Sequence, residues 1–411
     1  MDLKRRWLPM TCLVLLMGGC SWFNWLPWVG EDEDKEETKP AELVDFTPEL
    51  SLQRQWKAKI GEGLGKKYLR LMPVVVADTI IAADGYGEVE ALDRFSGKRI
   101  WQAKIGEVDS GWFSAFNFLD RKDPSFVSGG VGSGDGLIVL GTTLGFIIAL
   151  DAATGAEQWR TDLGSEMLSA AAIAEGMVYA QSADGRLVAL DRETGELRWT
   201  YDNQLPILTL RGTSSPVVDA GIVYAGFANG KLVALRATNG EPIWEHRVML
   251  PEGRSELERM VDVDTKALLS GPSVFIGAYQ GRVKSLSRRD GRALWEREIS
   301  TFLDLAEGYG QVYAIDENDV VTAIEQQTGE VAWEQEDFKR RLLSPPLAFS
   351  NYLVFGDAEG YLHVIAQRDG RHLGRRKVDG DGIRSMAIVA NSIVYVLGNS
   401  GSLQSFEIEL K

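Results

Sequence analysis

Short apolar stretches separated by turn-forming residues recur from about residue 51 to the last residue of the chain. In the clearest copy, Gly185–Trp199, apolar residues stand two and five positions after the first glycine. Such a run is typical of a short buried strand. Asp191 and a Thr-Gly pair follow and predict a tight hairpin, because the acid accepts backbone N–H groups and the glycine takes a positive φ. The closing tryptophan then suits packing between consecutive sheets.

This unit occurs eight times. Its first position is occupied by Gly87, Gly145, Gly185, Gly230, Gly281, Asp319, Gly360 and Gly401. Ten residues later a second glycine recurs in seven copies, and fourteen residues later a tryptophan recurs in six, with Gly374 in its place in the seventh. Roughly 360 residues shared among eight copies give about 45 residues each, which is typical of a four-stranded propeller blade.

The eighth copy begins at Gly401 and the chain ends at Lys411, before its tryptophan. Trp56, in contrast, has no glycine start before it. One unit is therefore predicted to be split between the two ends of the repeat region. Two further strand signals precede each start, and no helical periodicity is present. We expect an all-β fold: an eight-bladed β-propeller of four-stranded antiparallel blades over residues 51–411, closed by pairing of N- and C-terminal strands.

The first residues predict export. Lys4–Arg6 precede a short apolar run, Trp7–Met17, which is too short to span a bilayer and predicts a signal peptide over residues 1–19. Leu16–Cys20 resembles the bacterial lipobox, which implies lipidation of Cys20, although Met17 departs from the commoner leucine. Ser21 after the cysteine implies sorting to the outer membrane in such lipoproteins. An ordinary cleaved signal with a chance cysteine is the alternative.

Charge and cysteine content narrow the class of protein. Glu31–Glu37 holds six acids and one lysine, so residues 20–50 are expected to form a solvated, flexible acidic tether. The formal net charge of −15 argues against nucleic acid as a partner. Both cysteines, Cys12 and Cys20, precede the repeats, so no disulfide is expected in the propeller.

Catalytic and metal-binding patterns are not found. The three histidines, His246, His363 and His372, lie in different contexts without cysteines nearby, so no metal site of ordinary spacing is predicted. No phosphate-binding loop, serine elbow or paired acid motif stands apart from the turn aspartates. We therefore expect a non-enzymatic protein without a cofactor.

The intervals between units vary, and the longest follow Trp56, Trp101, Trp199 and Trp244. Such connections all open on one face of a propeller, and insertions confined to one face often mark the binding face. The largest insertion, residues 107–135, is rich in aromatic residues. These aromatics either fold over their own blade or form part of a partner surface, and both interpretations stay open.

Two neighbouring connections form the candidate docking patch. One contains Leu208–Gly212 and the other Met260–Thr265, and they belong to successive blades. Leucines beside an arginine, next to two acids, are typical of a protein interface with an apolar centre and a charged rim. The alternative is that Arg211 simply pairs with Asp262 or Asp264 and ties the two connections together.

The motifs also carry a resemblance to known families. Ala149–Trp159 and Ala189–Trp199 are similar to the tryptophan-docking repeat of the quinoprotein (PQQ-dependent) dehydrogenases. The whole chain more closely resembles the PQQ-like repeat lipoproteins of outer-membrane protein assembly, which use the repeat without the cofactor. The most specific matches are Leu208–Gly212, Asp262–Thr265 and Gly356–His363, and Gly111–Ser114 is a weaker one.

This resemblance implies a non-enzymatic scaffold subunit of the β-barrel assembly machinery, the BAM complex, anchored in the outer membrane by its lipid and facing the periplasm. It implies docking on the periplasmic POTRA domains of BamA, the central barrel subunit. The implied contact residues are Leu208, Leu210, Arg211, Asp262 and Asp264. Edge pairing with nascent outer-membrane proteins is a weaker second route, because a closed ring offers few free edges. A PQQ-dependent dehydrogenase and a peptidoglycan- or sugar-binding lipoprotein are the alternatives.

Overall fold

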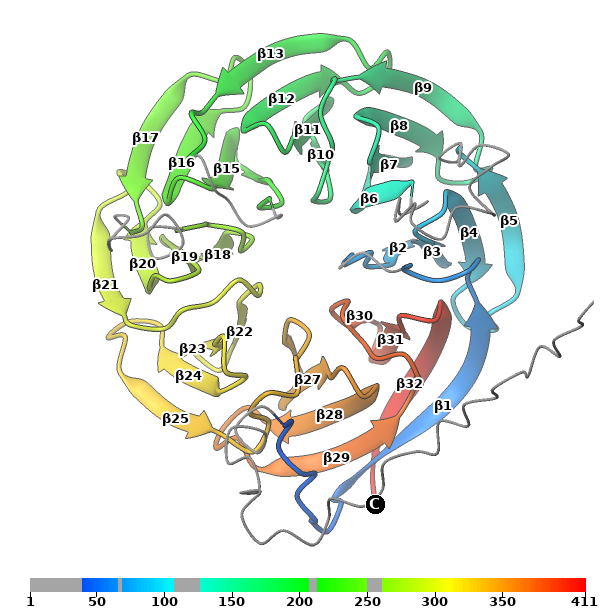
Figure 1. The fold of residues 1–411 in the computed structure, drawn as a ribbon, viewed down its shortest axis with the longest axis vertical. Coiled ribbons are helices and arrows are strands. Elements are labelled where there is room, and N and C mark those ends of the chain that lie inside the picture. Colours follow the sequence, from blue (N-terminus) through cyan, green and yellow to red (C-terminus); the bar gives the residue numbers. More distant parts are fainter. Residues whose placement is uncertain (1–38, 66–68, 107–125, 207–212, 250–260) are drawn as a thin grey trace, which may run out of the picture. The chain divides into compact units, whose positions relative to one another are not determined.

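The computed structural model describes residues 39–65, 69–106, 126–206, 213–249 and 261–411. The chain divides into two units, residues 1–39 and residues 40–411, and the second contains all the described secondary structure. In it, 32 strands form eight four-stranded antiparallel sheets arranged as a ring (Figure 1). Within the described ranges, no helix is long and apolar enough to cross a membrane.

Each sheet is one blade, with its first strand near the ring axis and its last strand on the outside (Figure 1). The first four blades are β2 (Val74–Val76), β3 (Thr79–Ala83), β4 (Glu88–Asp93) and β5 (Arg99–Lys104); β6 (Val127–Gly134), β7 (Leu137–Thr142), β8 (Phe146–Asp151) and β9 (Glu157–Asp162); β10 (Ala172–Ala174), β11 (Met177–Gln181), β12 (Arg186–Asp191) and β13 (Leu197–Asp202); β14 (Val217–Asp219), β15 (Ile222–Phe227), β16 (Lys231–Arg236) and β17 (Pro242–Arg247).

The next three blades are β18 (Leu268–Ser270), β19 (Ser273–Ile276), β20 (Val283–Ser287) and β21 (Ala293–Arg297); β22 (Ala306–Gly308), β23 (Gln311–Ile315), β24 (Val321–Glu325) and β25 (Val331–Gln335); β26 (Leu347–Phe349), β27 (Tyr352–Gly356), β28 (Tyr361–Ala366) and β29 (His372–Lys377). The eighth blade combines both ends of the repeat region, as β30 (Ile388–Ala390), β31 (Ile393–Leu397), β32 (Ser402–Leu410) and β1 (Leu50–Lys59).

The split blade closes the ring. Strand β1 pairs antiparallel with β32 from Leu50 opposite Leu410 to Lys59 opposite Ser402, with a bulge before Trp56. The predicted eight-bladed propeller, with its N- and C-terminal strands joined in one blade, is therefore confirmed. Because β1 is the outer strand of that blade, Trp56 takes the place of the tryptophan that the eighth copy lacks.

The tryptophans hold neighbouring blades together. Each indole is on an outer strand and donates its Nε1–H to a backbone carbonyl in the hairpin of the next blade. The seven bonds, between 2.7 and 3.1 Å long, run from Trp56 to Arg94, Trp101 to Ala152, Trp159 to Arg192, Trp199 to Ala237, Trp244 to Arg288, Trp295 to Gln326 and Trp333 to Gln367. Each bond satisfies a polar group that packing between two sheets would otherwise leave unpaired.

The second glycine of the repeat is required by this contact as well as by its turn. Gly195 has φ +71°, and a Cβ placed on it would lie 2.5 Å from Cε3 of Trp159. The same tryptophan-to-glycine contact recurs at Gly97, Gly155, Gly240, Gly291, Gly329 and Gly370. Sequence reasoning assigned these glycines to the positive φ of the hairpin alone. The structure adds close packing against the indole as a second cause.

Gly374, the one departure from the tryptophan pattern, lies where the ring is split. The next blade joins β32 to β1 across the chain ends, so it has no β32–β1 hairpin for an indole to dock on. A Cβ on Gly374 would instead lie 3.2 Å from Leu52 and 3.3 Å from the carbonyl oxygen of Leu50. Both leucines are buried in a core cluster with the seventh blade. Strand β1 therefore fills the position that tryptophan takes elsewhere.

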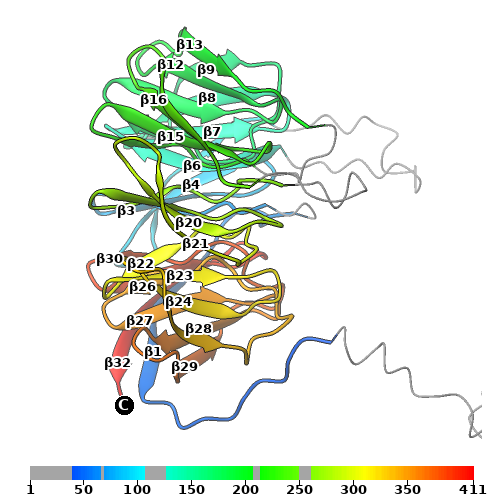
Figure 2. The same cartoon turned by 90° about the vertical axis from the view of Figure 1, so that its left-hand side faces the viewer.

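The two faces of the ring carry different connections (Figure 2). Hairpins such as the one at Asp191–Gly195 between β12 and β13 lie on one face, called here the hairpin face. The segments that join each outer strand to the first strand of the next blade lie on the other, called the connection face, because every outer strand runs from hairpin to connection. The predicted grouping of all such connections on one face is confirmed for the described residues.

Residues 40–49, called here the strap, precede β1 and lie against the seventh blade (Figure 2). We expected residues 20–50 to be a flexible tether. Within that range the strap makes backbone and side-chain contacts with the propeller, including a hydrogen bond of 2.9 Å from Glu49 N to Leu373 O. Residues 20–38 of the predicted tether, and the predicted signal peptide over residues 1–19, lie outside the described residues.

The double requirement on the hairpin glycines gives a stability prediction. Gly195→Ala is expected to destabilise the propeller by about 2–4 kcal/mol, because positive φ and the clash with Trp159 both oppose a Cβ. Gly176→Ala is the matched control, since Gly176 has φ +76° but no atom within 4 Å of the added Cβ. That variant is expected to lose only about 1 kcal/mol. Urea unfolding compares the two, and equal losses would remove the packing cause.

Candidate docking surface

The two connections that sequence analysis singled out are neighbours. Ser214 donates its hydroxyl to the carbonyl oxygen of Thr265 at 2.9 Å, which ties the segment before β14 to the segment before β18. The Thr265 hydroxyl in turn bonds the carbonyl oxygen and the N–H of Gly277 at 2.9 and 3.0 Å. The predicted proximity of these connections is thus confirmed for their described parts. Leu208, Leu210 and Arg211 lie outside the described residues, as does Cys20.

Asp262 is buried. Its carbonyl oxygen accepts the N–H of Tyr279 at 2.9 Å, forming an isolated bridge between the connection and the segment after β19, and the residue is 1% exposed. The bridge holds the backbone on either side of Val263, which packs against Gly226 of the preceding blade. In this position Asp262 supports the connection and faces Asp264 rather than solvent.

Asp264 is half-buried and lies at the wall between two cavities. Burial raises the pKa of its carboxyl to about 6, against the opposing effects of its hydrogen bond with Asp262 and of the Arg70 charge, and Asp304 adds to the rise. In the part of the chain that the structure describes, Asp264 Oδ1 is buried without a hydrogen-bond partner. A carboxylate oxygen in this state can accept a donor from a bound partner, since an unpaired buried acceptor costs about 1–3 kcal/mol.

The larger cavity has a volume of about 500 Å³ and lies on the ring axis. All eight blades contribute to it, through residues in or before their first strands. Its lining is mostly apolar, with a few polar groups, and includes Arg70, Leu168, Thr213, Asp264, Phe302 and Leu342. The smaller cavity, about 230 Å³, shares Leu168, Thr213 and Asp264 with it. Concave apolar surfaces with a few polar groups are typical of binding sites.

Arg70 is one residue of this surface that sequence analysis missed. Its Nη1 donates to the carbonyl oxygen of Phe302 at 3.1 Å, and its guanidinium lies 5.3 Å from the centre of the Phe302 ring. It also supplies the positive charge that partly offsets the burial of Asp264. Arg70 comes from the connection before β2, on a blade distant in sequence from β18, so no local motif pointed to it.

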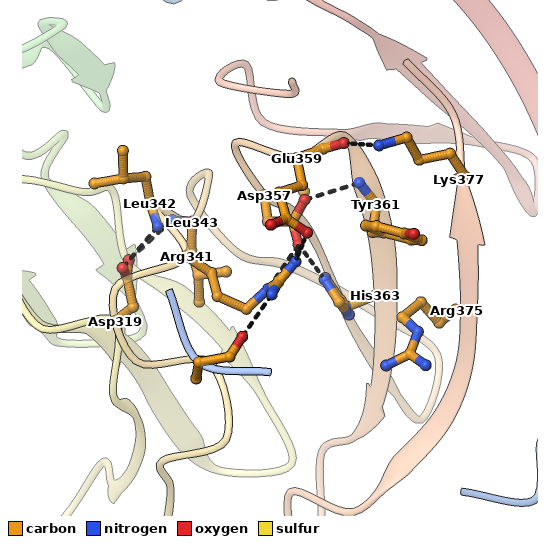
Figure 3. Close-up of polar contacts among 12 residues, drawn as sticks. Asp319, Arg341, Leu342, Leu343, Asp357, Glu359, Tyr361, His363, Arg375 and Lys377 are labelled. Atoms are coloured by element: carbon orange, nitrogen blue, oxygen red, sulfur yellow. Dashed lines mark hydrogen bonds and ion pairs between the residues drawn. The ribbon is translucent and has the colours of Figure 1, made fainter. Parts of the chain in front are cut away.

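Leu342 is the second missed residue. It is 62% exposed at the cavity, with φ +53°, a conformation that costs a branched side chain free energy. Asp319 holds it there, because its carboxylate accepts the N–H groups of Leu342 at 2.7 Å and Leu343 at 2.8 Å (Figure 3). Asp319 is the residue that replaces a start glycine in the repeat. That departure was the available signal, and its physical role is to fix this turn.

The motif Gly356–His363 builds a buried ionic cluster beside this turn (Figure 3). Nε and Nη2 of Arg341 donate to Asp357 Oδ2 at 2.9 and 2.7 Å, and His363 Nε2 lies 2.9 Å from the same oxygen. Burial lowers the pKa of His363, whereas its hydrogen bond to Asp357 opposes that change. At 3% exposure or less, these three side chains are structural and do not face the cavity.

Within the described ranges, no three His, Cys, Asp or Glu side chains are placed to hold a metal ion. The geometry therefore defines a class: a closed propeller with a concave, partly desolvated axial surface on its connection face. Comparison with known proteins gives the particular family.

The sequence matches the family described as "Outer membrane protein assembly factor BamB" over residues 85–335 and 304–410. It is 40% identical to the BamB of Pseudomonas aeruginosa over 399 residues, which is 97% of this chain and 98% of that protein. It is 33% identical to the BamB of Escherichia coli K12 over 407 residues, 98% of this chain and 99% of the other. The chain belongs to the BamB family of outer-membrane protein assembly factors.

The solved structures agree with this assignment. The crystal structure of BamB from Moraxella catarrhalis has a TM-score of 0.77 and 27% identity, and the match covers 87% of this chain and 100% of that one. Quinohemoprotein alcohol dehydrogenase from Comamonas testosteroni has a TM-score of 0.68 at 16% identity, over 87% of this chain and 76% of that one. The second likeness is one of fold alone, so the chain belongs with the assembly factors and not with the dehydrogenases.

Desolvation of Asp264 predicts that the stability of the propeller decreases as pH rises. A carboxyl with a raised pKa contributes stability that is full below pH about 4 and is lost as pH rises through about 6. Asp264→Asn keeps the neutral form, so at pH 7.5 it is expected to unfold at higher urea, with a gain of about 1 kcal/mol after allowance for partial exposure. At pH 4 the gain should vanish.

A control on the hairpin face separates this effect from a general effect of amide substitution. Hydrogen bonding to Ser287 lowers the pKa of Asp290, so its ionised form is favoured in the fold. Asp290→Asn is therefore expected to gain no stability at pH 7.5. A gain at Asp290, or none at Asp264, would contradict the assignment of Asp264 as a desolvated acid.

Proposed function

We propose that this chain is a lipid-anchored scaffold subunit of the BAM complex, which docks on the periplasmic POTRA domains of BamA and assists the folding and insertion of outer-membrane proteins. Family membership supports the assembly role over the dehydrogenase and sugar-binding alternatives. The docking contact is proposed to lie on the connection face, on Leu208, Leu210, Arg211 and Asp264 together with the axial cavity, and Asp262 is proposed to support it from the interior.

One observation carries the docking proposal: Asp264 presents a buried, unbonded carboxylate oxygen at a largely apolar cavity. Desolvated charged groups beside apolar surface are the arrangement in which a partner's donor gains most on binding. A cationic or N–H donor of the partner would satisfy Oδ1 and remove the cost that the isolated propeller bears.

The remaining residues divide by role. Asp262, being buried, acts as the support that fixes the backbone next to Asp264 through its bridge to Tyr279. Leu208 and Leu210 supply the apolar centre, and Arg211 the cationic rim, on the neighbouring connection. Arg70 and Leu342 extend the surface across the axis, since both line the cavity that Asp264 lines.

Membrane attachment is the second part of the proposal. The lipobox at Leu16–Cys20, with Ser21 after it, supports lipidation of Cys20 and sorting to the outer membrane with the propeller in the periplasm. One lipid anchor at the start of the predicted tether would leave the propeller free to reach a membrane-bound partner.

Co-purification with BamA from detergent-solubilised membranes tests the contact. The triple change Leu208→Ala, Leu210→Ala and Arg211→Ala is expected to reduce recovered BamA at least about tenfold at moderate salt, since loss of a central apolar cluster commonly costs more than about 2 kcal/mol. Leu197→Ala is the matched control, because Leu197 is 55% exposed but lies on outer strand β13. Undiminished recovery with the triple variant would refute the patch.

Cys20→Ser tests the anchor separately. In cells depleted of BamA, the variant is expected to leave the outer-membrane fraction and collect in the soluble periplasmic fraction, because the lipid is proposed to supply the remaining membrane affinity. Urea unfolding of the propeller should be unchanged. Retention of the variant in membranes of cells that lack BamA would show that another feature holds it there.

A further inference from the structure

The strap, residues 40–49, is bound to the propeller at both of its ends. At its N-terminal end Ala41 N donates to the carbonyl oxygen of Lys339 at 2.9 Å. At its C-terminal end Glu49 N donates to the carbonyl oxygen of Leu373, and Lys411 N donates to that of Glu49, both at 2.9 Å. Backbone bonds at both ends fix the path of the segment between them.

A buried arginine recognises the strap. Arg341 Nη1 donates to the carbonyl oxygen of Ala41 at 2.7 Å, while Nε and Nη2 bind Asp357 and Nη2 also binds Glu359 at 2.6 Å (Figure 3). The Arg341 side chain is 2% exposed. Loss of the Ala41 carbonyl would leave a buried guanidinium donor unpaired, which costs about 1–3 kcal/mol. The ionic cluster of the Gly356–His363 motif therefore also serves to hold the strap.

Phe46 is the side-chain anchor in the middle of the strap. Its ring stacks on His372 with 5.1 Å between centroids, and the guanidinium of Arg375 lies 5.3 Å from its centre. Arg375 also donates Nη1 to the carbonyl oxygen of Val44 at 3.1 Å. Aromatic stacking and a cation over the ring contribute about 0.5–1.5 kcal/mol each beyond burial.

The strap crosses from one face of the ring to the other. Glu49 bonds near the start of β29, where the hairpin lies, whereas Ala41 bonds Lys339 and Arg341 in the connection between β25 and β26. The segment thus runs antiparallel to β29 along the outside of the seventh blade (Figure 2). Without it the chain would leave the propeller at Leu50, on the hairpin face.

We infer that the strap is a built-in clamp that moves the exit point of the membrane tether to the connection face, where the proposed docking surface lies. This inference rests on the proposed lipid anchor at Cys20. The clamp presents the axial cavity and Asp264 on the side from which the tether leaves, so the propeller is oriented before it meets its partner.

The distances show that the exit point matters. Ten residues span about 33 Å when extended. The predicted tether, taken as a flexible coil of twenty residues, has an expected r.m.s. length of about 25 Å. The clamp therefore shifts the exit by a distance comparable to the mean reach of the tether, and a free coil of thirty residues would not select a face.

Hydrogen exchange of the full chain tests the clamp itself. The double variant Phe46→Ala and Arg375→Ala removes the ring, the cation and the Val44 bond but leaves the β-sheets intact. Exchange in the peptide covering residues 40–49 is expected to be about tenfold faster than in the wild-type chain. Val44→Ala is the matched control, because Arg375 uses only the Val44 backbone and its side chain is 39% exposed. Wild-type exchange as fast as in a free peptide would overturn the clamp.

Orientation is measured with the lipidated chain on vesicles of phosphatidylethanolamine and phosphatidylglycerol. The repeats contain no cysteine, so a dye can be placed on the connection face by Lys266→Cys or on the hairpin face by Glu193→Cys. Energy transfer to a lipid-phase acceptor is expected to be at least about twofold stronger from position 266, and the strap variant should bring the two positions to near equality.

Three results separate the parts of this inference. Equal energy transfer from both positions in the wild-type chain would overturn the orienting role. The binding of the strap to the propeller would still be decided by the hydrogen-exchange experiment. Unequal transfer that persists in the strap variant would also overturn it. Failure of the lipidated wild-type chain to bind vesicles would instead overturn the proposed anchor, and with it the membrane orientation.

Discussion

Docking of an indole between consecutive blades is the interaction on which the rest of this structure depends. A four-stranded blade buries one face against each neighbour, and the tryptophan sets the separation of the two sheets by its size and their register by its hydrogen bond. Trp199, for example, is 9% exposed and reaches the carbonyl oxygen of Ala237 at 2.9 Å. This contact recurs at seven of the eight blade interfaces, and β1 takes the place of the indole at the eighth.

The same interaction explains which positions tolerate no side chain. Gly240 lies against Trp199, and its φ of +72° is compatible with a tight hairpin. Contact with the indole and a positive φ both require glycine there. The glycine is therefore the same residue in every complete copy, whereas the apolar positions vary among Val, Ile and Leu. Where the ring is split, no hairpin exists and neither partner is needed, which is why Gly374 can replace tryptophan without leaving a void.

Periodicity made the fold predictable from the sequence. Every copy of the repeat has the same pattern because it occupies the same local environment. The eight copies therefore predicted the number of blades, and Trp56, which has no start glycine before it, predicted the closure of the ring. The structural role of a residue that departs from the repeat could not be predicted from the repeat itself. Sequence analysis recognised Asp319 only as an exception among the start glycines, whereas its carboxylate holds the backbone of Leu342 and Leu343 near the axis.

The candidate surface was predictable only in part, for a physical reason. Asp262 and Asp264 were proposed together because they belong to one motif, but burial distinguishes them, and burial depends on residues from other blades. Arg70 and Phe302 meet because the ring brings the first and sixth connections of the chain to one axis. The strap contains no part of the repeat, and the acidic residues before it predicted a solvated tether rather than a segment bound to the propeller. Its contacts depend on Arg341 and Arg375, about 300 residues further along the chain.

A closed ring also explains how the fold can retain a side chain that lowers its stability, such as Asp264. Its desolvated carboxylate lowers the stability of the isolated chain, and the left-handed Leu342 adds a further cost. Both lie on connections whose ends are fixed by β-sheets on either side, so neither can relax without disturbing two blades. The stability of the ring is spread over many blade interfaces, and a local cost of one or two kcal/mol is small against their sum. A rigid ring can therefore keep in place the exposed, desolvated axial surface that the proposed docking contact requires.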